Sequence, residues 1–390
     1  MSLLKILQIS KYYYPHFGGV ENYIYTLSSE LSKLNHNVTV VSSNDKFKLK
    51  TDNIGKVKVI RFPKIFEIFN APVSFNLLFF PISNYDIIHL HLPNPFASLW
   101  ILLSKKKNLV VTYHSDIIKF GFLKEVLSFL YTKLILVKLL RRTKKIIITS
   151  PNYLEGSPIL QKFKQKVIVI PCCVDLSFFK LNKKNMKKLI QLKKKYKHKK
   201  IILFVGRLVP YKGLEYLLEA MKKVTQKFTN VKLLIIGNGP EKDKLKSLAN
   251  SLDLNGFIDF LDEIKNVDLP LYYNLCGIFV LPSTYKAEAF GIAQLEAMAC
   301  KKPVISTNIH GSGVPFVNIH GKTGLVVKPK SSQELANAIS FLLTNENLRK
   351  KFGENAFKRV KNNFNKNIMV RRILDVYKLI DEPVGAYGKR

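Results

Sequence analysis

Two glutamates in residues 283–306, STYKAEAFGIAQLEAMACKKPVIS, are the side chains best spaced for chemistry in this sequence. Glu288 lies just before an expected helix, next to Phe290 and Gly291, and Glu296 lies about one and a half turns inside it. The start of a helix presents unpaired N–H groups and the positive end of the helix dipole, which suit a diphosphate or a sugar oxygen. Glu288 would accept hydrogen bonds from sugar hydroxyls, and Glu296 from another part of the ligand, such as a ribose. The structural alternative is that Glu288 only caps the start of the helix and that Glu296 lies on the surface.

Two cations, Arg207 and Lys212, follow the strand expected at residues 200–206, in the sequence VGRLVPYKG. Open α/β sheets bind ligands at the carboxyl ends of their strands. An arginine offers a fork of donors to a phosphate and a lysine offers a compact charge, so the pair predicts an anion site. Solvated surface charges in a basic chain are the alternative. Because both residues are expected in a loop, the sequence predicts no part for them in folding.

Glycines follow two other expected strands. Gly18 and Gly19, in FGGVENY, lie between a strand and a helix, where the backbone could approach a phosphate closely. Gly237 and Gly239, in GNGPEKDKL, follow a strand in the second half of the chain and could border a nucleotide. Ordinary turns are the alternative for both pairs, since the sequence does not contain the dinucleotide fingerprint G-x-G-x-x-G.

A histidine ends the strand expected at residues 108–114. His114 and Asp116, in VVTYHSD, stand at the carboxyl end of this apolar strand in the first half of the chain. His114 could contact a transferred sugar, and a satisfied structural histidine agrees with the same pattern.

The elements that position these residues alternate between strands and helices. Strands that are apolar throughout imply sheets covered on both faces, and two runs of them imply two doubly wound domains. We predict an α/β fold of two Rossmann-like domains that face each other across a cleft. Strands are expected at residues 5–10, 38–43, 86–91, 108–114, 144–150, 166–171, 200–206, 231–237, 277–283, 302–308 and 324–329, and helices at 21–34, 213–224, 240–252 and 292–300.

The boundary between the domains is expected near the Lys-rich segment 183–200, whose charge and lack of a wide apolar stripe indicate a solvated linker helix. We predict a first domain at residues 1–178 and a second at residues 179–361. Residues 362–390 are expected to form a C-terminal helix that packs back on the first domain, followed by a frayed tail.

The net charge of +36, from 63 basic and 27 acidic side chains, indicates anionic partners. The segment 121–145 combines large apolar residues with basic ones, and Lys105–Lys107 form a second basic cluster. These features predict docking on an anionic membrane surface, with packing of the apolar residues in the core as the alternative. No nucleic-acid-binding module is recognisable, so no nucleic-acid partner is expected. The basic residues of the segment are Lys133, Lys138, Arg141, Arg142, Lys144 and Lys145.

The sequence also indicates the compartment. The four cysteines show neither metal-ligand spacing nor a disulfide framework, which favours a reducing environment. The first residues lack the pattern of a secretory signal. The uncharged stretches 68–85 and 87–104 are broken by proline and asparagine, so neither is expected to span a membrane. We predict a cytoplasmic protein that docks on the inner face of the membrane.

Several motifs, in order over nearly the whole chain, resemble the family 4 retaining glycosyltransferases of GT-B fold. They are GGVENY, YHSDI, VGRLVPYKG, GNGP and EAFGIAQLEAMACKKPVIS. The E-x(7)-E element with EAFG is the most specific, and GSGVPFVNIHGKTGL is similar to the branch acting on lipid-linked polysaccharide or oligosaccharide chains. The resemblance implies a first domain that binds a glycan or lipid-linked acceptor and a second that binds a UDP- or GDP-sugar. A hexose would be transferred to an acceptor hydroxyl with retention.

The resemblance also assigns roles to residues. Catalytic roles fall to His114, Arg207, Lys212 and Glu288, and donor-binding roles to Gly18, Gly19, Gly237, Phe290, Gly291 and Glu296. The two cations would neutralise the diphosphate, His114 and Glu288 would contact the sugar, and Glu296 would hold the ribose. No Asp-x-Asp motif is present, so neither a metal nor another cofactor is expected, and the cations with the helix dipole would replace the metal.

Two positions depart from the family pattern. Cys173, in IPCCVD, and Asp262, in DFLDE, stand where the family usually has glycine. Because of the change at Asp262, the resemblance does not indicate which nucleotide base the donor carries. A sugar-nucleotide epimerase or hydrolase of the same fold is the second class, against which the EAFG element argues, and a basic nucleic-acid-binding protein is the third.

Overall fold

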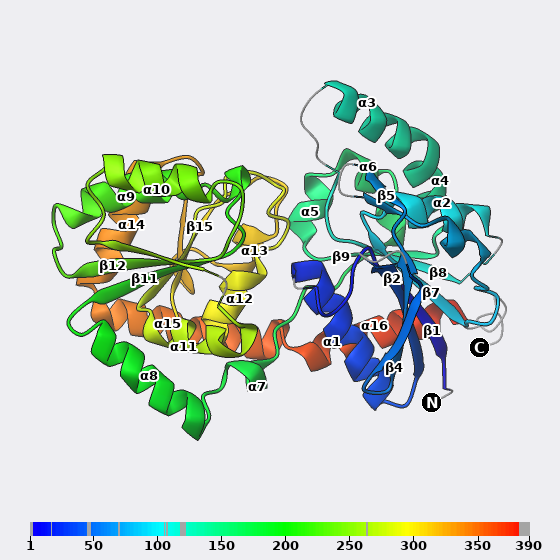
Figure 1. Cartoon of the computed structure of the whole chain (residues 1–390), viewed down its shortest axis with the longest axis horizontal. Coiled ribbons are helices and arrows are strands. Elements are labelled where there is room, and N and C mark those ends of the chain that lie inside the picture. Colours follow the sequence, from blue (N-terminus) through cyan, green and yellow to red (C-terminus); the bar gives the residue numbers. More distant parts are fainter. Residues whose placement is uncertain are drawn as a thin grey trace. The chain divides into compact units, whose positions relative to one another are not determined.

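The computed structural model of the chain describes residues 3–16, 18–44, 48–68, 71–104, 106, 108–117, 122–262 and 264–381. The chain forms two compact units, which are Met1–Cys172 with Lys366–Arg390 (unit 1) and Cys173–Asn365 (unit 2). In each unit, helices lie on either side of a central sheet (Figure 1). The sequence analysis places the corresponding boundaries after residues 178 and 361.

Unit 1 is built on an eight-stranded sheet with the order β10-β9-β8-β7-β1-β2-β4-β3. Its neighbouring strands are parallel except for the antiparallel pair of β3 and β4, which the sequence analysis did not predict. Every residue of β7 and β8 is buried, as expected for a sheet covered on both faces. The strands are β1 (Lys5–Ile9), β2 (Asn37–Asn44), β3 (Lys50–Ile54), β4 (Val57–Pro63), β7 (Ile87–Leu92), β8 (Leu109–Tyr113), β9 (Lys145–Ile148) and β10 (Val167–Val169), with β5 (Phe66–Ile68) and β6 (Ala71–Val73) in a separate two-stranded sheet.

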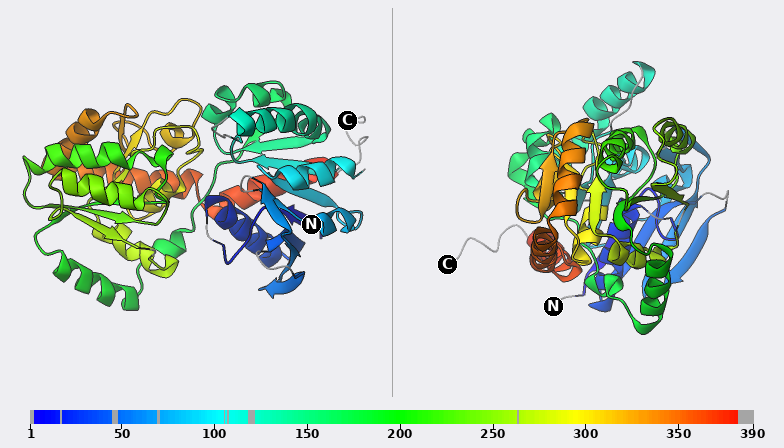
Figure 2. Two further views of the ribbon diagram at one scale, coloured as in Figure 1. Left: turned by 45° about the horizontal axis from the view of Figure 1, so that its top comes forward. Right: turned by 90° about the vertical axis from the view of Figure 1, so that its left-hand side faces the viewer.

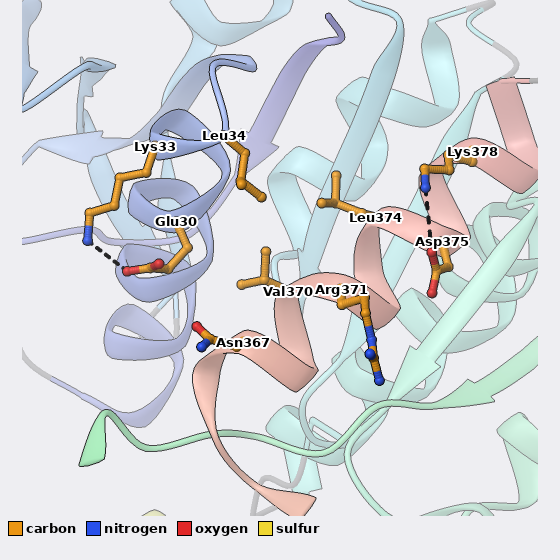
Figure 3. Close-up of a pocket in the computed structure, with 9 residues that line it drawn as sticks. All are labelled: Glu30, Lys33, Leu34, Asn367, Val370, Arg371, Leu374, Asp375 and Lys378. Carbon is orange, nitrogen blue, oxygen red and sulfur yellow. Dashed lines mark hydrogen bonds and ion pairs between the residues drawn. The ribbon is translucent and has the colours of Figure 1, made fainter. Parts of the chain in front are cut away.

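The C-terminal helix α16 (Lys366–Asp381) packs on α1 (Gly19–Lys33) within unit 1. Val370 and Leu374 of α16 and Leu34 beyond α1 line a groove of about 310 Å³ with charged side chains around it (Figure 3). None of the predicted site residues lines this groove. The other helical segments of unit 1 are η1 (Phe75–Phe79), α2 (Pro95–Leu103), α3 (Phe122–Tyr131), η2 (Thr132–Leu136), α4 (Val137–Arg142), α5 (Pro151–Glu155), α6 (Pro158–Gln161) and η3 (Lys164–Lys166).

Unit 2 is built on a six-stranded sheet with the order β13-β12-β11-β14-β15-β16, and every neighbouring pair of strands is parallel. From β11 the chain first adds strands on one side and then crosses to β14 on the other, so the order reverses between these two. The predicted α/β fold of two Rossmann-like domains is confirmed. The strands are β11 (Lys200–Val205), β12 (Val231–Ile236), β13 (Ile258–Leu261), β14 (Ile278–Leu281), β15 (Val304–Thr307) and β16 (Gly324–Val327).

The Lys-rich segment forms α8 (Lys183–Lys195), as predicted. Its one buried residue is Leu189, on the side that packs against α11, and most of its lysines are exposed. The other helical segments of unit 2 are α7 (Leu176–Phe179), η4 (Pro210–Lys212), α9 (Leu214–Thr225), α10 (Lys242–Ser251), η5 (Asn266–Asp268), α11 (Leu269–Leu275), α12 (Ile292–Ala299), α13 (Val314–Val317), α14 (Ser332–Thr344) and α15 (Glu346–Asn363).

Helix α3 projects from the rest of unit 1, as Figure 1 and Figure 2 both show. It continues through the π-helical turn η2 into α4, where Leu139 and Leu140 are buried. Throughout the described ranges, no helix is long and apolar enough to cross a membrane. The uncharged stretch 87–104 forms β7 and α2.

Candidate active site

Three of the predicted residues of unit 2 follow two neighbouring strands. Arg207 and Lys212 come after β11, and Glu288 comes after β14, which pairs with β11. The strand order reverses between β11 and β14, and such a point is where open α/β sheets bind ligands. The sheet thus brings side chains that are far apart in the sequence to one edge.

Lys212 and Glu288 form a buried ion pair. Lys212 Nζ lies 2.5 Å from Glu288 Oε2, and the two side chains are only 11% and 10% exposed. Ser283 Oγ donates a 2.9 Å hydrogen bond to the same oxygen. Burial opposes the charge of the ammonium group, but the Glu288 carboxylate together with Tyr211 and Glu296 raises the pKa of Lys212. This buried ion pair argues against the expectation that Lys212 has no part in folding, because its removal would leave Glu288 buried without a counter-charge.

Arg207 differs from Lys212 in its surroundings. Its side chain is exposed, and no carboxylate in the described part of the chain pairs with it. Its fork of donors is therefore open to an anion, as the sequence predicts. Of the two predicted cations, Arg207 offers an uncompensated charge, and Lys212 shares its charge with Glu288.

Helix α12 begins directly after Phe290 and Gly291. Gly291 has a φ of 74°, and a Cβ at this position would lie 2.7 Å from Leu281 Cδ2, so both conformation and space require glycine. Phe290 is buried and packs edge-to-face on Phe364. The backbone N–H groups of the first helical turn point toward the loop that carries Glu288, and the helix dipole adds positive potential there.

Glu296, inside α12, accepts a 2.6 Å hydrogen bond from the hydroxyl of Tyr273 on α11. Burial raises the pKa of Glu296, against the lowering effects of this hydrogen bond and of the Lys212 charge. Lys212 therefore acts on both glutamates of the E-x(7)-E element. Sequence reasoning missed Tyr273, because a tyrosine in a short apolar helix carries no functional signal of its own.

Gly237 and Gly239 follow β12, where their backbone packs on the loop after β11. Gly237 has a φ of 141°, and a Cβ there would collide with the carbonyl oxygen of Gly206. The close approach of the two loops explains why residue 237 is glycine without any ligand. The structure therefore supports the turn alternative for Gly237 and leaves its donor-binding role a prediction.

The predicted residues of unit 1 follow β1 and β8. Gly18 has an extended backbone and precedes α1, and Gly19 is the first residue of that helix. The strand order of unit 1 reverses between β1 and β7, so the loop that carries both glycines starts at a topological switch point. His114 follows β8, and its backbone N–H donates to the carbonyl of Leu92 at 3.1 Å.

His114 belongs to a cluster of buried histidines. Its Nε2 lies 3.1 Å from His91 Nδ1, and His91 Nε2 lies 2.7 Å from Gln8 Oε1. Tyr23 packs edge-on against both rings. Burial lowers the pKa of His114 to about 3 and that of His91 well below its usual range, so both rings are neutral at pH 7. Sequence reasoning missed Gln8, His91 and Tyr23. Gln8 and His91 lie inside apolar strands and Tyr23 lies inside a helix, so none of them stands at a strand end where a site residue was expected.

Asp116 is held by hydrogen bonds to side chains of the same unit. Its Oδ1 accepts hydrogen bonds from the hydroxyls of Tyr113 at 2.8 Å and Ser157 at 3.3 Å, and its backbone N–H donates to the hydroxyl of Tyr153 at 2.6 Å. These contacts fix the loop after β8, and with it the backbone next to His114.

Comparison with known proteins gives the family. Residues 17–178 match the family described as Glycosyltransferase Family 4, and residues 185–359 match Glycosyl transferases group 1. Over 382 residues the chain is 31% identical to O-antigen chain mannosyltransferase C of Escherichia coli, which covers 96% of this chain and 98% of that protein. The chain belongs to glycosyltransferase family 4.

Further comparisons agree with this assignment. The family 4 glycosyltransferase is 34% identical over 283 residues to D-rhamnosyltransferase WbpZ of Pseudomonas aeruginosa, covering 72% of this chain and 70% of that protein. The structure of Anabaena HepE in complex with UDP-glucose aligns with 96% of this chain and 100% of its own, with a TM-score of 0.75 and 19% identity. This likeness shows a common GT-B fold.

The two departures from the family pattern have different surroundings in this glycosyltransferase. Asp262 directly follows β13 and forms an ion pair with Lys242, which lowers the pKa of Asp262. Cys173 is half-buried and is the first residue of unit 2. Where relatives usually have a glycine after this strand, the chain therefore carries a carboxylate with its own cation.

The described residues contain no group of three or more His, Cys, Asp or Glu side chains arranged to hold a metal ion. The predicted independence of metals and other cofactors stays a prediction.

Proposed function

We propose that this glycosyltransferase moves a hexose from a UDP- or GDP-sugar to a hydroxyl of a glycan or lipid-linked acceptor, with retention of the anomeric configuration. The proposal is carried by the ion pair of Lys212 and Glu288 before the N-terminus of α12, with Arg207 on the same connection after β11 as Lys212. This cluster combines an open cation for a diphosphate with an oriented carboxylate for sugar hydroxyls.

The named relatives support the same substrates. HepE is described in complex with UDP-glucose, and two relatives are named a mannosyltransferase of the O-antigen chain and a D-rhamnosyltransferase. A nucleotide sugar is therefore the proposed donor, and a growing polysaccharide chain in glycan biosynthesis is the proposed acceptor.

The chemistry requires positive charge at the leaving group. The bond between the anomeric carbon and the diphosphate breaks, the electron pair leaves with the diphosphate, and the acceptor oxygen forms the new bond as its proton is released. Arg207 and the N–H groups at the start of α12 would stabilise the charge that develops on the leaving diphosphate. Glu288, held by Lys212, would orient the sugar, and Glu296 would hold the ribose. The roles of Gly18, Gly19 and His114 stay predictions from the resemblance.

The deciding experiment measures release of free nucleoside diphosphate from a panel of UDP- and GDP-sugars, with and without a lipid-linked acceptor. We expect one donor to give acceptor-dependent release, with the anomeric configuration of the donor kept in the product, as read by NMR. Release without acceptor would indicate a hydrolase, and conversion of the donor sugar without release would indicate an epimerase. An inverted product would contradict retention.

We also propose that α3 docks on an anionic lipid surface. Val126, Leu127 and Leu130 of α3 and Leu134 of η2, which continues α3, are between 38% and 52% exposed and lie on one side by their spacing. The alternative was that the apolar residues of segment 121–145 pack in the core. It is wrong for these four exposed residues and correct for α4, where Leu139 is buried.

The basic residues of the segment are also divided. Lys133, Lys138 and Arg141 are exposed, whereas Arg142 and Lys144 donate hydrogen bonds to carbonyl groups within unit 1. The surface that we propose for docking therefore consists of the exposed apolar residues of α3 and η2 together with Lys133, Lys138 and Arg141. Lys105 and Lys107 lie outside the described residues.

A further inference from the structure

A chain of hydrogen bonds in unit 1 runs from the C-terminal helix to the predicted site residue His114. Gln8 Nε2 donates to the hydroxyl of Tyr377 on α16 at 2.9 Å, and Gln8 Oε1 lies 2.7 Å from His91 Nε2. His91 Nδ1 in turn lies 3.1 Å from His114 Nε2. Gln8, His91 and Tyr377 are at most 2% exposed, so water does not compete for these contacts.

The donors and acceptors of this chain have one consistent direction. An amide oxygen only accepts, so His91 Nε2 carries a hydrogen that it donates to Gln8 Oε1. Because His91 is neutral, its Nδ1 has a lone pair, and His114 Nε2 must supply the hydrogen between the two rings. His114 is neutral as well, which leaves its Nδ1 without a hydrogen.

The Nδ1 atom of His114 is the open end of the chain. It has no hydrogen-bond partner in the described part of the protein, and the His114 side chain keeps a small exposed fraction of 6%. A bare imidazole nitrogen accepts a hydrogen bond from a hydroxyl and cannot donate one to a phosphate oxygen. Its chemistry fits a sugar and not a diphosphate.

We propose that His91 and Gln8 are positioning residues that keep the hydrogen of His114 on Nε2, so that Nδ1 accepts a hydrogen bond from a hydroxyl of the donor sugar. The inference rests on the proposed function, in which His114 contacts the sugar. The Tyr377 hydroxyl accepts from Gln8 Nε2 and can donate its own hydrogen to His89 Nδ1, 2.6 Å away, which leaves the Gln8 oxygen facing His91. Turning this amide over would reverse every donor and acceptor as far as His114.

The position of the hydrogen can be read by NMR on protein labelled with ¹⁵N in its histidines, at pH 7 and without ligand. We expect the Nε2–H form of His114 in the wild type. His91→Phe removes the acceptor and Gln8→Met removes the oxygen that orients His91, so both should shift His114 toward the Nδ1–H form. His91→Asn, whose Oδ1 takes the place of Nδ1, should keep the wild-type form.

Thr143→Val is the matched control. Thr143 is buried, and its hydroxyl donates to the carbonyl of Leu139, so the variant removes a buried hydroxyl that lies outside this network. It should leave the tautomer of His114 unchanged. An unchanged tautomer in both His91→Phe and Gln8→Met would overturn the proposal.

Activity separates positioning from the proposed function. With UDP-glucose or GDP-mannose as donor, whichever the panel shows to be active, kcat should fall about 3- to 10-fold in His91→Phe and Gln8→Met, as for loss of one neutral hydrogen bond. His91→Asn should restore it, and the affinity for UDP or GDP should not change. If the tautomer shifts in His91→Phe and Gln8→Met without any loss of transfer, and His114→Ala also transfers normally, the role of His114 at the sugar is overturned instead.

Discussion

At the scale of single residues, the site of unit 2 divides its positive charge unequally between two side chains. Lys212 is buried against Glu288, whereas Arg207 is exposed without a carboxylate partner among the residues described. Removing one member of a buried pair leaves an uncompensated charge. We infer that Lys212 fixes the Glu288 carboxylate and that Arg207 is the better placed cation for direct binding of the diphosphate.

We expect Arg207→Ala and Lys212→Ala each to slow transfer by about 100- to 1000-fold, as loss of an electrostatic contact to the transition state does. The two should differ in stability. Lys212→Ala should lower the free energy of unfolding by about 3–5 kcal/mol because Glu288 stays buried, whereas Arg207→Ala should melt like the wild type. Turnover and thermal melting measure both effects. Near-normal turnover in both variants would place the phosphate site elsewhere.

The control for this prediction replaces both charges at once. Lys212→Met combined with Glu288→Gln leaves a neutral pair of similar volume, so most of the lost stability should return. Transfer should stay low, since the oriented carboxylate is gone. If the double variant melts as low as Lys212→Ala, the ion pair is not the source of the stability.

The two glutamates should be separable by calorimetric titration with UDP or GDP. Glu288→Gln should reduce turnover more than nucleotide affinity, because Glu288 is assigned to the sugar. Glu296→Gln should weaken binding of the bare nucleotide, because Glu296 is assigned to the ribose, while Tyr273 can still donate to the new amide oxygen. The reverse pattern would exchange the two roles.

Glu296→Gln should also change how stability depends on pH. The pKa of Glu296 is raised by burial above its usual 4.5, so the folded state holds this proton more tightly than the unfolded state. Its contribution to stability is present below pH 4.5 and is lost as the pH rises through the raised pKa. The glutamine variant lacks this loss, so it should melt higher than the wild type at pH 7 and similarly at pH 4. Equal melting at both values would mean that Glu296 ionises freely in the fold.

At the scale of elements, we propose that the start of α12 and the loop after β11 would supply the positive charge that a metal supplies in other transferases. No suitable cluster of ligands occurs among the described side chains, and helix N-termini stabilise anions. We expect EDTA to leave transfer largely intact in the assay with the active donor. Complete loss of transfer that manganese or magnesium restores would contradict this mechanism.

The elements that the sequence predicted well are those with a single physical cause. The buried strand β14 is a continuous apolar run, and β7 and β8 are mostly apolar, so their positions follow from the local sequence pattern. The hairpin of β3 and β4 was missed, because β3 is polar and largely exposed and gives no apolar signal. Its pairing with β4 depends on the rest of the sheet.

The candidate site was predictable in its location and not in its internal contacts. Strand ends marked Arg207, Lys212 and Glu288, and the structure brings the last two into contact. That contact depends on the adjacency of β11 and β14, which is a property of topology. Gln8 and His91 could not be recognised for the same reason, since each is a polar residue inside an apolar strand whose partners lie on other elements.

At the scale of the whole molecule, the basic residues behind the charge of +36 lie in segments of different character. The segment 183–200 is rich in lysine, but α8 has only two exposed apolar residues, Met186 and Ile190. Helix α3 instead combines an exposed apolar face with nearby cations. Reversible membrane binding needs both an apolar and an electrostatic contribution, which favours α3 as the docking element.

We therefore predict that the protein pellets with anionic vesicles at low salt and that binding grows with anionic lipid and fades as salt is added. Leu127→Ser with Leu130→Ser and Leu134→Ser should abolish pelleting, because the apolar face is lost. Replacing Lys133, Lys138 and Arg141 by glutamine should weaken it at every salt concentration, since each basic residue near the surface contributes roughly 1 kcal/mol. The matched control replaces Lys183, Lys187 and Lys194 of α8 by glutamine, which removes the same charge from unit 2 and should have a smaller effect. A larger effect of the α8 variant would assign docking to unit 2, and failure of the wild type to pellet would leave the excess charge without this explanation.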